Sequence, residues 1–373
     1  MKKYTVALLA ILFTAISAVS CSDSKPEPTR AAAGNLDKPE FHTARGDEYL
    51  SKGNYADAQN SYERALELAP SDINGKSGKY LAQIYTASEP GNAALVKKDA
   101  ETALSGLNAL KKEAASDAEK ARVSIFLIRG YSVAKLSSDW YTRSQSEYDT
   151  VKKLGVSAES AEFYMAEADA QKFAVKSAID RYERVIAVKG VHASEADRKL
   201  EKMQKIRRAI PSTTVGRDIA YEDEISRADT AGLLLTRTTL TEKRVQKAID
   251  IQGHVMLDVI NSVLNLGIRG LEADASGKFY PDKPITRAEF AVILEDILIR
   301  LTSQPQLATK YIGEDSPFPD VSPDKWFYNA ARVSVERQFI EIPNKINGEF
   351  RPSDPVSGAD SLIAVRILKD GLK

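Results

Sequence analysis

The hydrophobic pattern between residues 38 and 72 has the period of two short α-helices. Small and aromatic residues recur on the faces that would meet: Gly46, Tyr49, Ala58, Tyr62 and Ala65. The small residues let two helices approach closely, and the tyrosines fill the space that is left. Gly53 and Asn54 favour a turn, and Pro70 ends the second helix. The pattern therefore predicts an antiparallel helical hairpin.

This hairpin resembles a tetratricopeptide repeat (TPR), a unit of about 34 residues, although His42 and Arg45 stand where the family usually has Trp and Leu. A single repeat cannot bury its own face, so neighbours are expected. Residues 177–184 (SAIDRYER) echo residues 57–64 (DAQNSYER) and predict a second copy. Three stretches between them also have helical patterns: 80–112, 121–136 and 161–174. We expect a short, degenerate α-solenoid over residues 39–190.

The aromatic stripe of this solenoid has two interpretations. It packs the core, or it lines a concave groove for a peptide or a partner helix. The sequence singles out no residue for the groove.

The second half of the chain repeats one pattern three times. Residues 285–294 (ITRAEFAVIL) predict a helix with Thr286 as N-cap and Glu289 closing a capping box. The same pattern occurs at 225–234 (ISRADTAGLL) and, more degenerate, at 356–363 (VSGADSLI).

The resemblance extends upstream of the last two caps. A Gly-x-Phe-x-Pro loop stands at 277–281 and at 348–352, and each follows a helical stretch, 258–266 and 326–338. We expect three helical units at about 195–245, 246–305 and 316–373.

Together these features resemble three tandem S-layer homology (SLH) domains over residues 195–373. The resemblance implies a mainly α chain, in which a TPR-like α-solenoid precedes a three-unit helical pseudo-trimer. It also implies that grooves between units bind an anionic cell-wall glycan or peptidoglycan-linked polymer. Carried over by position, the glycan-binding residues are Arg287, Thr286, Gly277, Arg227 and Trp326.

Several positions depart from the family. Gly358 replaces the cap Arg of the third unit, and Val255 stands where a Trp is usual. Gly216 and Asp218 are expected in a first-unit loop that lacks the Phe-x-Pro signature. At most one or two grooves are therefore expected to bind. Arg287 with Glu289 also fits a purely structural capping pair, and Trp326 also fits the core.

The N-terminal residues have the pattern of a secretory signal. Lys2 and Lys3 precede the apolar run 6–16, which is shorter than the ~20 residues of a membrane span. Ala18 to Cys21 (AVSC) resembles the lipobox of bacterial lipoproteins, which implies lipidation of Cys21. Residues 1–20 then form a signal peptide and 21–38 a flexible tether. The alternative is a plain secreted protein with Cys21 as a free thiol.

Composition narrows the function. Lys plus Arg and Asp plus Glu each number 52, so no charge excess favours nucleic acid. One Cys and three scattered His give no metal-ligand spacing, and no motif calls for a cofactor. The carboxylate run 222–224 (EDE) precedes a helix cap, where a solvated acidic surface is normal, so glycan hydrolysis is the weaker hypothesis.

We therefore expect no enzyme, but an envelope protein with three contacts. These are cell-wall glycan or peptidoglycan at the SLH units, a protein partner at the solenoid, and the membrane through the lipid. The expected location is the bacterial envelope, at the outer membrane facing the periplasm. The alternative is an assembly factor in which only the solenoid binds and the SLH region is a spacer.

Overall fold

The computed structural model describes residue 34 and residues 37–89, 93–211, 214–235 and 247–370. The predicted signal peptide (1–20), Cys21 and most of the predicted tether (21–38) lie outside the described residues. Within those ranges the protein is built from α-helices and one short 3-10 helix, with two isolated β-bridges and no strand. The predicted mainly α fold, with helices in repeat-like packing, is confirmed.

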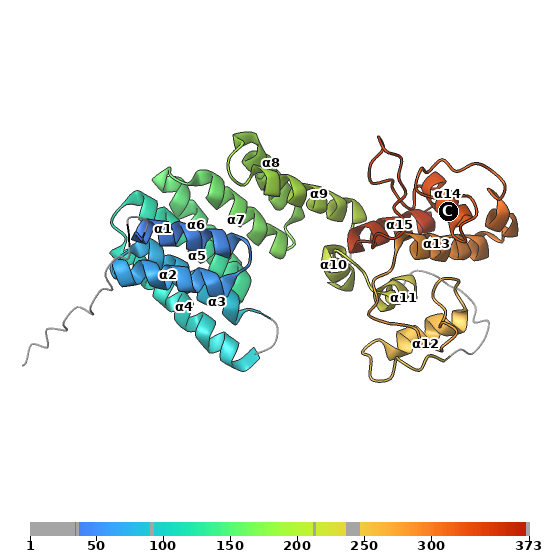
Figure 1. The fold of residues 1–373 in the computed structure, drawn as a ribbon, viewed down its shortest axis with the longest axis horizontal. Helices are drawn as coiled ribbons and strands as arrows, with labels where there is room; N and C mark the ends of the chain where they lie inside the picture. Colours follow the sequence, from blue (N-terminus) through green and yellow to red (C-terminus); the bar gives the residue numbers. More distant parts are fainter. Residues whose placement is uncertain (1–33, 35–36, 90–92, 212–213, 236–246, 371–373) are drawn as a thin grey trace, which may run out of the picture.

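The first half is a stack of helical hairpins, blue to green in Figure 1. Within each pair the two helices pack antiparallel, and successive pairs stack on one another. The pairs are α1 (Pro39–Ser51) with α2 (Tyr55–Leu68), α3 (Ile73–Ala87) with α4 (Ala93–Glu113), α5 (Asp117–Ala134) with α6 (Trp140–Leu154), and α7 (Ala158–Gln171) with α8 (Val175–Val188). The solenoid predicted from the first repeat is therefore present.

Tyr62 shows how the first hairpin is packed. Its ring is fully buried, and a Cβ added at Gly46 of α1 or Gly78 of α3 would lie 2.5 or 2.3 Å from it. Its hydroxyl donates to Asp47 Oδ1 at 2.6 Å. In the α7–α8 hairpin, the buried Tyr182 donates in the same way to Glu167, again fifteen residues earlier. The sequence echo between 57–64 and 177–184 therefore marks a repeated packing device.

The helix α9 (Ala193–Ala209) joins the two halves of the chain. It packs against α8 on one side and against the C-terminal helix on the other. Ala196, Met203 and Ile206 are buried in a hydrophobic core that runs from Phe163 to Leu368. The boundary expected between residues 190 and 195 falls at the start of this shared helix, and it stays a prediction.

The second half, yellow to red in Figure 1, contains shorter helices joined by long loops. Its elements are α10 (Thr214–Tyr221), α11 (Arg227–Leu235), α12 (Leu257–Leu266), α13 (Arg287–Thr302), the 3-10 helix η1 (Pro305–Thr309), α14 (Tyr328–Glu336) and α15 (Gly358–Asp370). The loop expected around Gly216 and Asp218 is wrong, since both residues lie in α10. The helices expected at 258–266 and 326–338 correspond to α12 and α14.

The three repeated caps meet in a ring of backbone hydrogen bonds. Ile285 N donates to Ile225 O at 2.9 Å, and Val356 N donates to Ile285 O at 3.1 Å. Ile225 N closes the ring by donating to Val356 O at 2.9 Å. Each of these residues directly precedes the N-cap of α11, α13 or α15. The three sequence copies are thus arranged around a pseudo-threefold axis.

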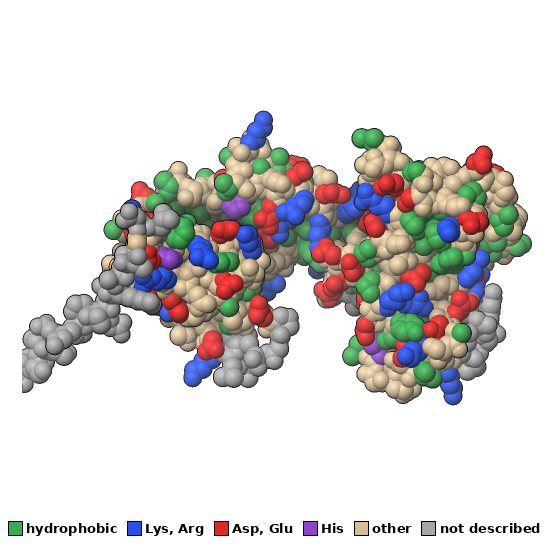
Figure 2. All heavy atoms as spheres, viewed as in Figure 1, with side chains coloured by type: hydrophobic (Ala, Val, Ile, Leu, Met, Phe, Trp, Pro, Cys, Tyr) green, Lys and Arg blue, Asp and Glu red, His purple; other side chains and the backbone are tan. Residues whose placement is uncertain are grey.

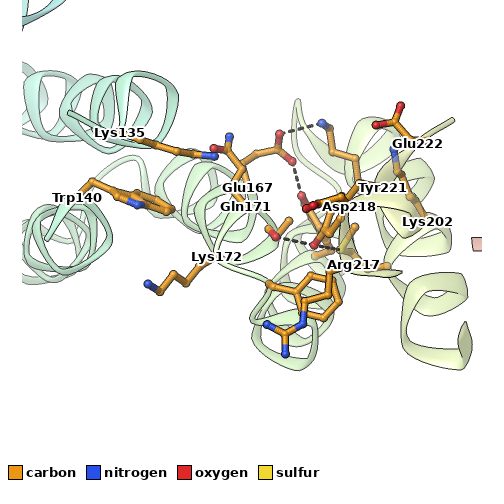
Figure 3. Close-up of a pocket in the computed structure, with 15 residues that line it drawn as sticks. Lys135, Trp140, Glu167, Gln171, Lys172, Lys202, Arg217, Asp218, Tyr221 and Glu222 are labelled. Atoms are coloured by element: carbon orange, nitrogen blue, oxygen red, sulfur yellow. Dashed lines mark hydrogen bonds and ion pairs between the residues drawn. The ribbon is translucent and has the colours of Figure 1, made fainter. Parts of the chain in front are cut away.

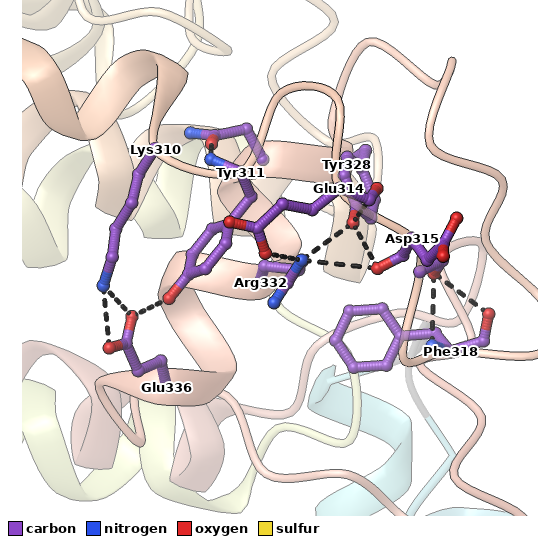
Figure 4. A network of polar contacts seen from close by, with 10 residues as sticks. Lys310, Tyr311, Glu314, Asp315, Phe318, Tyr328, Arg332 and Glu336 are labelled. Carbon is purple, nitrogen blue, oxygen red and sulfur yellow. Dashed lines mark hydrogen bonds and ion pairs between the residues drawn. The ribbon is translucent and has the colours of Figure 1, made fainter.

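A polar network fixes the segment between α13 and α14 (Figure 4). The Arg332 guanidinium lies 3.9 Å from the centre of the Tyr311 ring and donates to Glu314 at 2.7 Å. Lys310 pairs with Glu336 at 2.6 Å, and the Tyr311 hydroxyl donates to the same carboxylate. These contacts attach the connecting segment to α14.

Candidate binding sites

The predicted capping box at Thr286 is present. The Thr286 hydroxyl accepts from Glu289 N at 3.2 Å, and Glu289 Oε2 accepts from Thr286 N at 2.9 Å. Burial alone would raise the pKa of Glu289, but the Thr286 N–H and the Lys283 ammonium hold it below its ordinary value. Ser226 and Asp229 form the equivalent pair at α11. Thr286 therefore has a structural role that occupies its hydroxyl.

Arg227 clamps the loop of the second unit. Its Nε donates to Phe279 O at 2.8 Å, Nη1 to Gly270 O at 2.9 Å and Nη2 to Glu272 O at 3.1 Å. The guanidinium also lies 4.9 Å from the centre of the Phe279 ring. The residue is only 7% exposed, and burial lowers its pKa. All three nitrogens are used within the fold, so Arg227 acts as a structural residue here.

Arg287 repeats this clamp on the third unit, but less completely. Its Nε donates to Phe350 O at 2.8 Å and its Nη2 to Glu341 O at 2.9 Å. Among the described residues, Nη1 has no hydrogen-bond partner. The side chain is half-buried, and burial lowers its pKa. Arg287 thus combines the structural role with one nitrogen left for another acceptor.

A cavity of about 230 Å³ lies beside Arg287. Its walls come from α9, α13 and α15 and from the third-unit loops. The charged residues that line it are Glu201, Lys205, Arg287, Glu341, Asp354 and Asp360. Lys205 pairs with Asp360 at 3.4 Å, and Arg208 of α9 pairs with Glu341 at 2.8 Å. Carboxylates and cations side by side can hydrogen-bond both sugar hydroxyls and acidic sugar substituents.

Two aspartates hold the Gly-x-Phe-x-Pro loops in place. Asp250 accepts from Phe279 N at 2.8 Å and Tyr280 N at 2.7 Å. Burial opposes the charge of Asp250, but these N–H groups hold its pKa below the ordinary value. Asp320 accepts in the same way from Phe350 N and Arg351 N. Neither residue was predicted to have a role from the sequence, although each stands about thirty residues before its loop in both copies.

Gly277 and Trp326 lie away from the Arg287 cavity. Gly277 has φ of +79° in the second-unit loop, and its carbonyl accepts from Ile249 N at 2.9 Å. Trp326 is 69% exposed, so the interpretation of Trp326 as a core residue is wrong. Val255, at the matching position of the second unit, is 96% exposed. Thr286 and Arg287 are therefore adjacent, Arg227 is buried against the second-unit loop, and Gly277 and Trp326 lie elsewhere in the region.

The third inter-unit contact is built differently. Gly358 N donates to Glu222 O at 2.9 Å, and a Cβ at Gly358 would lie 1.6 Å from Ile219 O of α10. The helix α10 occupies the place where a loop stands in the other two contacts. A side chain at Gly358 would therefore meet the backbone of α10, and the weakening of the third groove stays a prediction.

A cavity of about 660 Å³ lies on the solenoid, lined mainly by residues of α1, α5 and α7. Arg122 makes two hydrogen bonds to Asp47, at 2.9 and 2.7 Å. Arg129 lies 4.4 Å from the centre of the Tyr164 ring and 5.5 Å from that of Phe126. The partner groove that the sequence left as one interpretation of the aromatic stripe would lie here, and it stays a prediction. Sequence alone gave no signal for these residues.

A larger cavity of about 830 Å³ lies between the solenoid and α10, and Figure 3 shows the residues that line it. Glu222 of the acidic run is among them. Asp223, its neighbour, is 85% exposed and pairs with Lys202 at 2.7 Å. The acidic run is thus a solvated surface at this point of the fold.

Comparisons with known proteins support both modules. The family model of the tetratricopeptide repeat matches residues 39–72, and that of the S-layer homology domain matches residues 271–291. A surface-layer 125 kDa protein of Lysinibacillus sphaericus is 29% identical over 116 residues, which are 31% of this chain. The match spans only 8% of that relative's length. No solved structure matches.

The two families indicate the kind of protein. Both are families of non-catalytic binding modules, and the SLH domain and the surface-layer relative point to the cell envelope or surface. Among the helices that the structure describes, none has the length and apolarity of a membrane span. The chain therefore contains a tetratricopeptide repeat and an S-layer homology domain, a pairing of protein-interaction repeats with a cell-wall-binding module.

Proposed function

We propose that the protein is a non-catalytic lipoprotein of the bacterial envelope that holds cell-wall polymer in its SLH region and a protein partner on its solenoid. The polymer is peptidoglycan or an associated anionic glycan. Lipidated Cys21 holds the chain at the outer membrane, facing the periplasm. Supporting this are the lone Cys in a lipobox-like context and the two matched families.

The observation that carries wall binding is the cavity beside Arg287. Its volume of about 230 Å³ is below the ~300–1,000 Å³ of sites that enclose a whole small ligand. It suits one sugar ring or one acidic substituent of a longer polymer. Arg287 Nη1 and Lys205 supply cations, and Asp354 supplies an acceptor for hydroxyls.

We further propose that all three copies are SLH units, of which the contact at Arg287 is the binding one. The ring through Ile225, Ile285 and Val356 supports three equivalent units. Arg227 is used within the fold, and Gly358 faces α10, so neither of the other contacts offers a free guanidinium.

A second candidate function keeps the SLH region as a rigid spacer, with binding only on the solenoid. The burial of Arg227 favours it, because the cap arginines then serve to hold the units together. The cavity of about 660 Å³ beside α1, α5 and α7 would then be the binding site for the protein partner.

Co-sedimentation of the full chain with purified sacculi and wall glycan distinguishes the two. We expect Arg287→Gln to weaken binding. Arg337→Gln removes the same charge from an exposed position and is the control. Asp354→Asn tests the groove without removing a clamp hydrogen bond, since the Asp354 side chain has no hydrogen bond to a described residue. An anionic ligand should bind this variant more tightly, and a neutral sugar less tightly. Sedimentation unchanged by both groove variants excludes this groove.

The lipid is tested separately. Cells fed an alkyne-tagged fatty acid should label the wild-type protein and not Cys21→Ser. Fractionation then reports the membrane. Labelling that persists in Cys21→Ser, or a wild-type protein that stays unlabelled, rejects the lipoprotein assignment.

A further inference from the structure

The cavity between the solenoid and α10 has a volume of about 830 Å³. This is within the ~300–1,000 Å³ of small-molecule sites. Its walls come from the ends of α5 and α6, the α7–α8 turn, α9 and α10. Both modules build it, and neither the TPR nor the SLH family assigns it a function.

The charges that line this cavity do not balance. Five cations face three carboxylates. Lys199 pairs with Glu167 at 2.9 Å, and Lys202 pairs with Asp223 at 2.7 Å. The other three cations, Lys135, Lys172 and Arg217, pair with no carboxylate of the described residues.

Two of the three unpaired cations lie at one end of the cavity, and Arg217 lies against Phe173. In Figure 3, Lys135, Trp140 and Lys172 lie at one end, whereas Asp218 and Glu222 lie at the other with Lys202. Lys135 Nζ is 5.6 Å from the centre of the Trp140 ring. Burial lowers the pKa of Lys135, as expected for an ammonium without a counter-charge.

An aromatic residue in a strained conformation lines the same cavity. Phe173 has φ of +62°, in the left-handed backbone region that residues other than Gly rarely adopt. The matching turn of the first hairpin has Gly53 there, with φ of +78°. Keeping Phe costs roughly 1–2 kcal/mol of backbone strain. In return its ring supports the Arg217 guanidinium, 5.0 Å from the ring centre, and gives the cavity an apolar wall.

We propose that this cavity binds an amphipathic carboxylate, a small molecule with one anionic end and an apolar body. The anionic end lies among Lys135, Lys172 and Arg217, where it supplies the missing counter-charge. The apolar body lies against Phe173 and Trp140. This binding is independent of wall attachment, because no residue of the Arg287 cavity takes part in it.

Trp140 gives a direct readout. The chain has two Trp, and Trp326→Phe in the full chain leaves Trp140 as the sole emitter. Decanoate carries both features of the proposed ligand, acetate only the charge, and decylammonium the same tail with the opposite charge. We expect decanoate to change the Trp140 emission saturably, and acetate and decylammonium to bind at least about tenfold more weakly.

Paired variants locate the charge. Lys135→Gln with Arg217→Gln should raise the decanoate Kd about tenfold or more, since hydrogen bonds to charged groups are removed. Lys153→Gln with Arg337→Gln removes the same charge from exposed positions elsewhere and should leave the Kd unchanged. All four residues are exposed, so the thermal midpoint should hold in both. Equal affinity for decylammonium, no saturable signal, or equal Kd values in the two double variants would overturn the proposal.

Discussion

Gly358 and Ile219 are in such close contact that a single added carbon at Gly358 would lie 1.6 Å from the Ile219 carbonyl oxygen. The same position in the other copies carries Arg227 or Arg287, whose guanidinium holds the loop of the next unit. Around Gly358 there is no loop to hold, because α10 stands in its place. The third copy therefore lacks both the arginine and the loop that the arginine would hold, and α10 fills the place of that loop.

Gly358→Ala is expected to destabilise the protein by about 3 kcal/mol, because backbone rather than a flexible side chain must move. Gly232→Ala is the control. Its added Cβ would lie 2.7 Å from the Met256 terminal methyl, which can rotate away, and 3.9 Å from Val259 Cγ1, an ordinary contact. Urea unfolding of the two variants measures the difference. Equal losses would mean that α10 shifts freely at Gly358.

Arg227→Gln is expected to cost more stability than Arg287→Gln. Arg227 is buried and leaves three carbonyl oxygens without a charged donor, which should cost about 3 kcal/mol or more. Arg287 is half-buried and donates to two carbonyls. Differential scanning calorimetry of both variants checks the order. A larger loss for Arg287→Gln would contradict the assignment of Arg227 as the tighter clamp.

Alkaline pH should loosen the junction at Tyr221. Its hydroxyl donates to Ala170 O at 2.6 Å, and burial raises its pKa to about 12. Between pH of about 10 and 12, the unfolded chain releases this proton while the folded chain retains it. Because the unfolded state then binds fewer protons, stability falls as pH rises through this window.

Tyr221→Phe removes this contribution. We expect the variant to be less stable than wild type at pH 9, but to lose less stability between pH 9 and pH 11. Urea midpoints at the two pH values give both numbers. An identical loss in wild type and variant would assign the alkaline effect to the other tyrosines.

The solenoid should need α9 to be stable on its own. Met203 and Ile206 of α9 are buried in the same core as Tyr182 and Val185 of α8. The free energy of unfolding of a fragment of residues 39–211 is expected to be at least about 3 kcal/mol higher than that of residues 39–190, because two large side chains are buried. Circular dichroism melts measure the difference. Equal stability would place the domain boundary before α9.

Sequence patterns predicted the repeated elements well, since each carries a local signal. The small residues and tyrosines of 38–72 predicted a hairpin, and the caps at Ser226, Thr286 and Ser357 predicted three copies. The capping boxes follow from spacing within one helix turn, so no distant contact is needed to infer them.

The same patterns did not predict which groups the arginines contact, or that the helix α10 forms. Whether a guanidinium faces solvent or carbonyl oxygens depends on a loop more than forty residues away, as for Arg227 and Phe279. At Gly216 and Asp218, a loop was expected by analogy with the other copies, yet packing against α15 favours a helix. Trp326 was given a core interpretation, and its exposure depends on neighbours that local pattern does not define.

The closed ring through Ile225, Ile285 and Val356 has a mechanical consequence. The chain enters this region through α9, α15 is the last helix that the structure describes in it, and these two helices pack on each other. A pulling force that reaches this region from the solenoid therefore acts on α15 as well as on α9. The units would share such a force and yield together, rather than peel away one after another in sequence order.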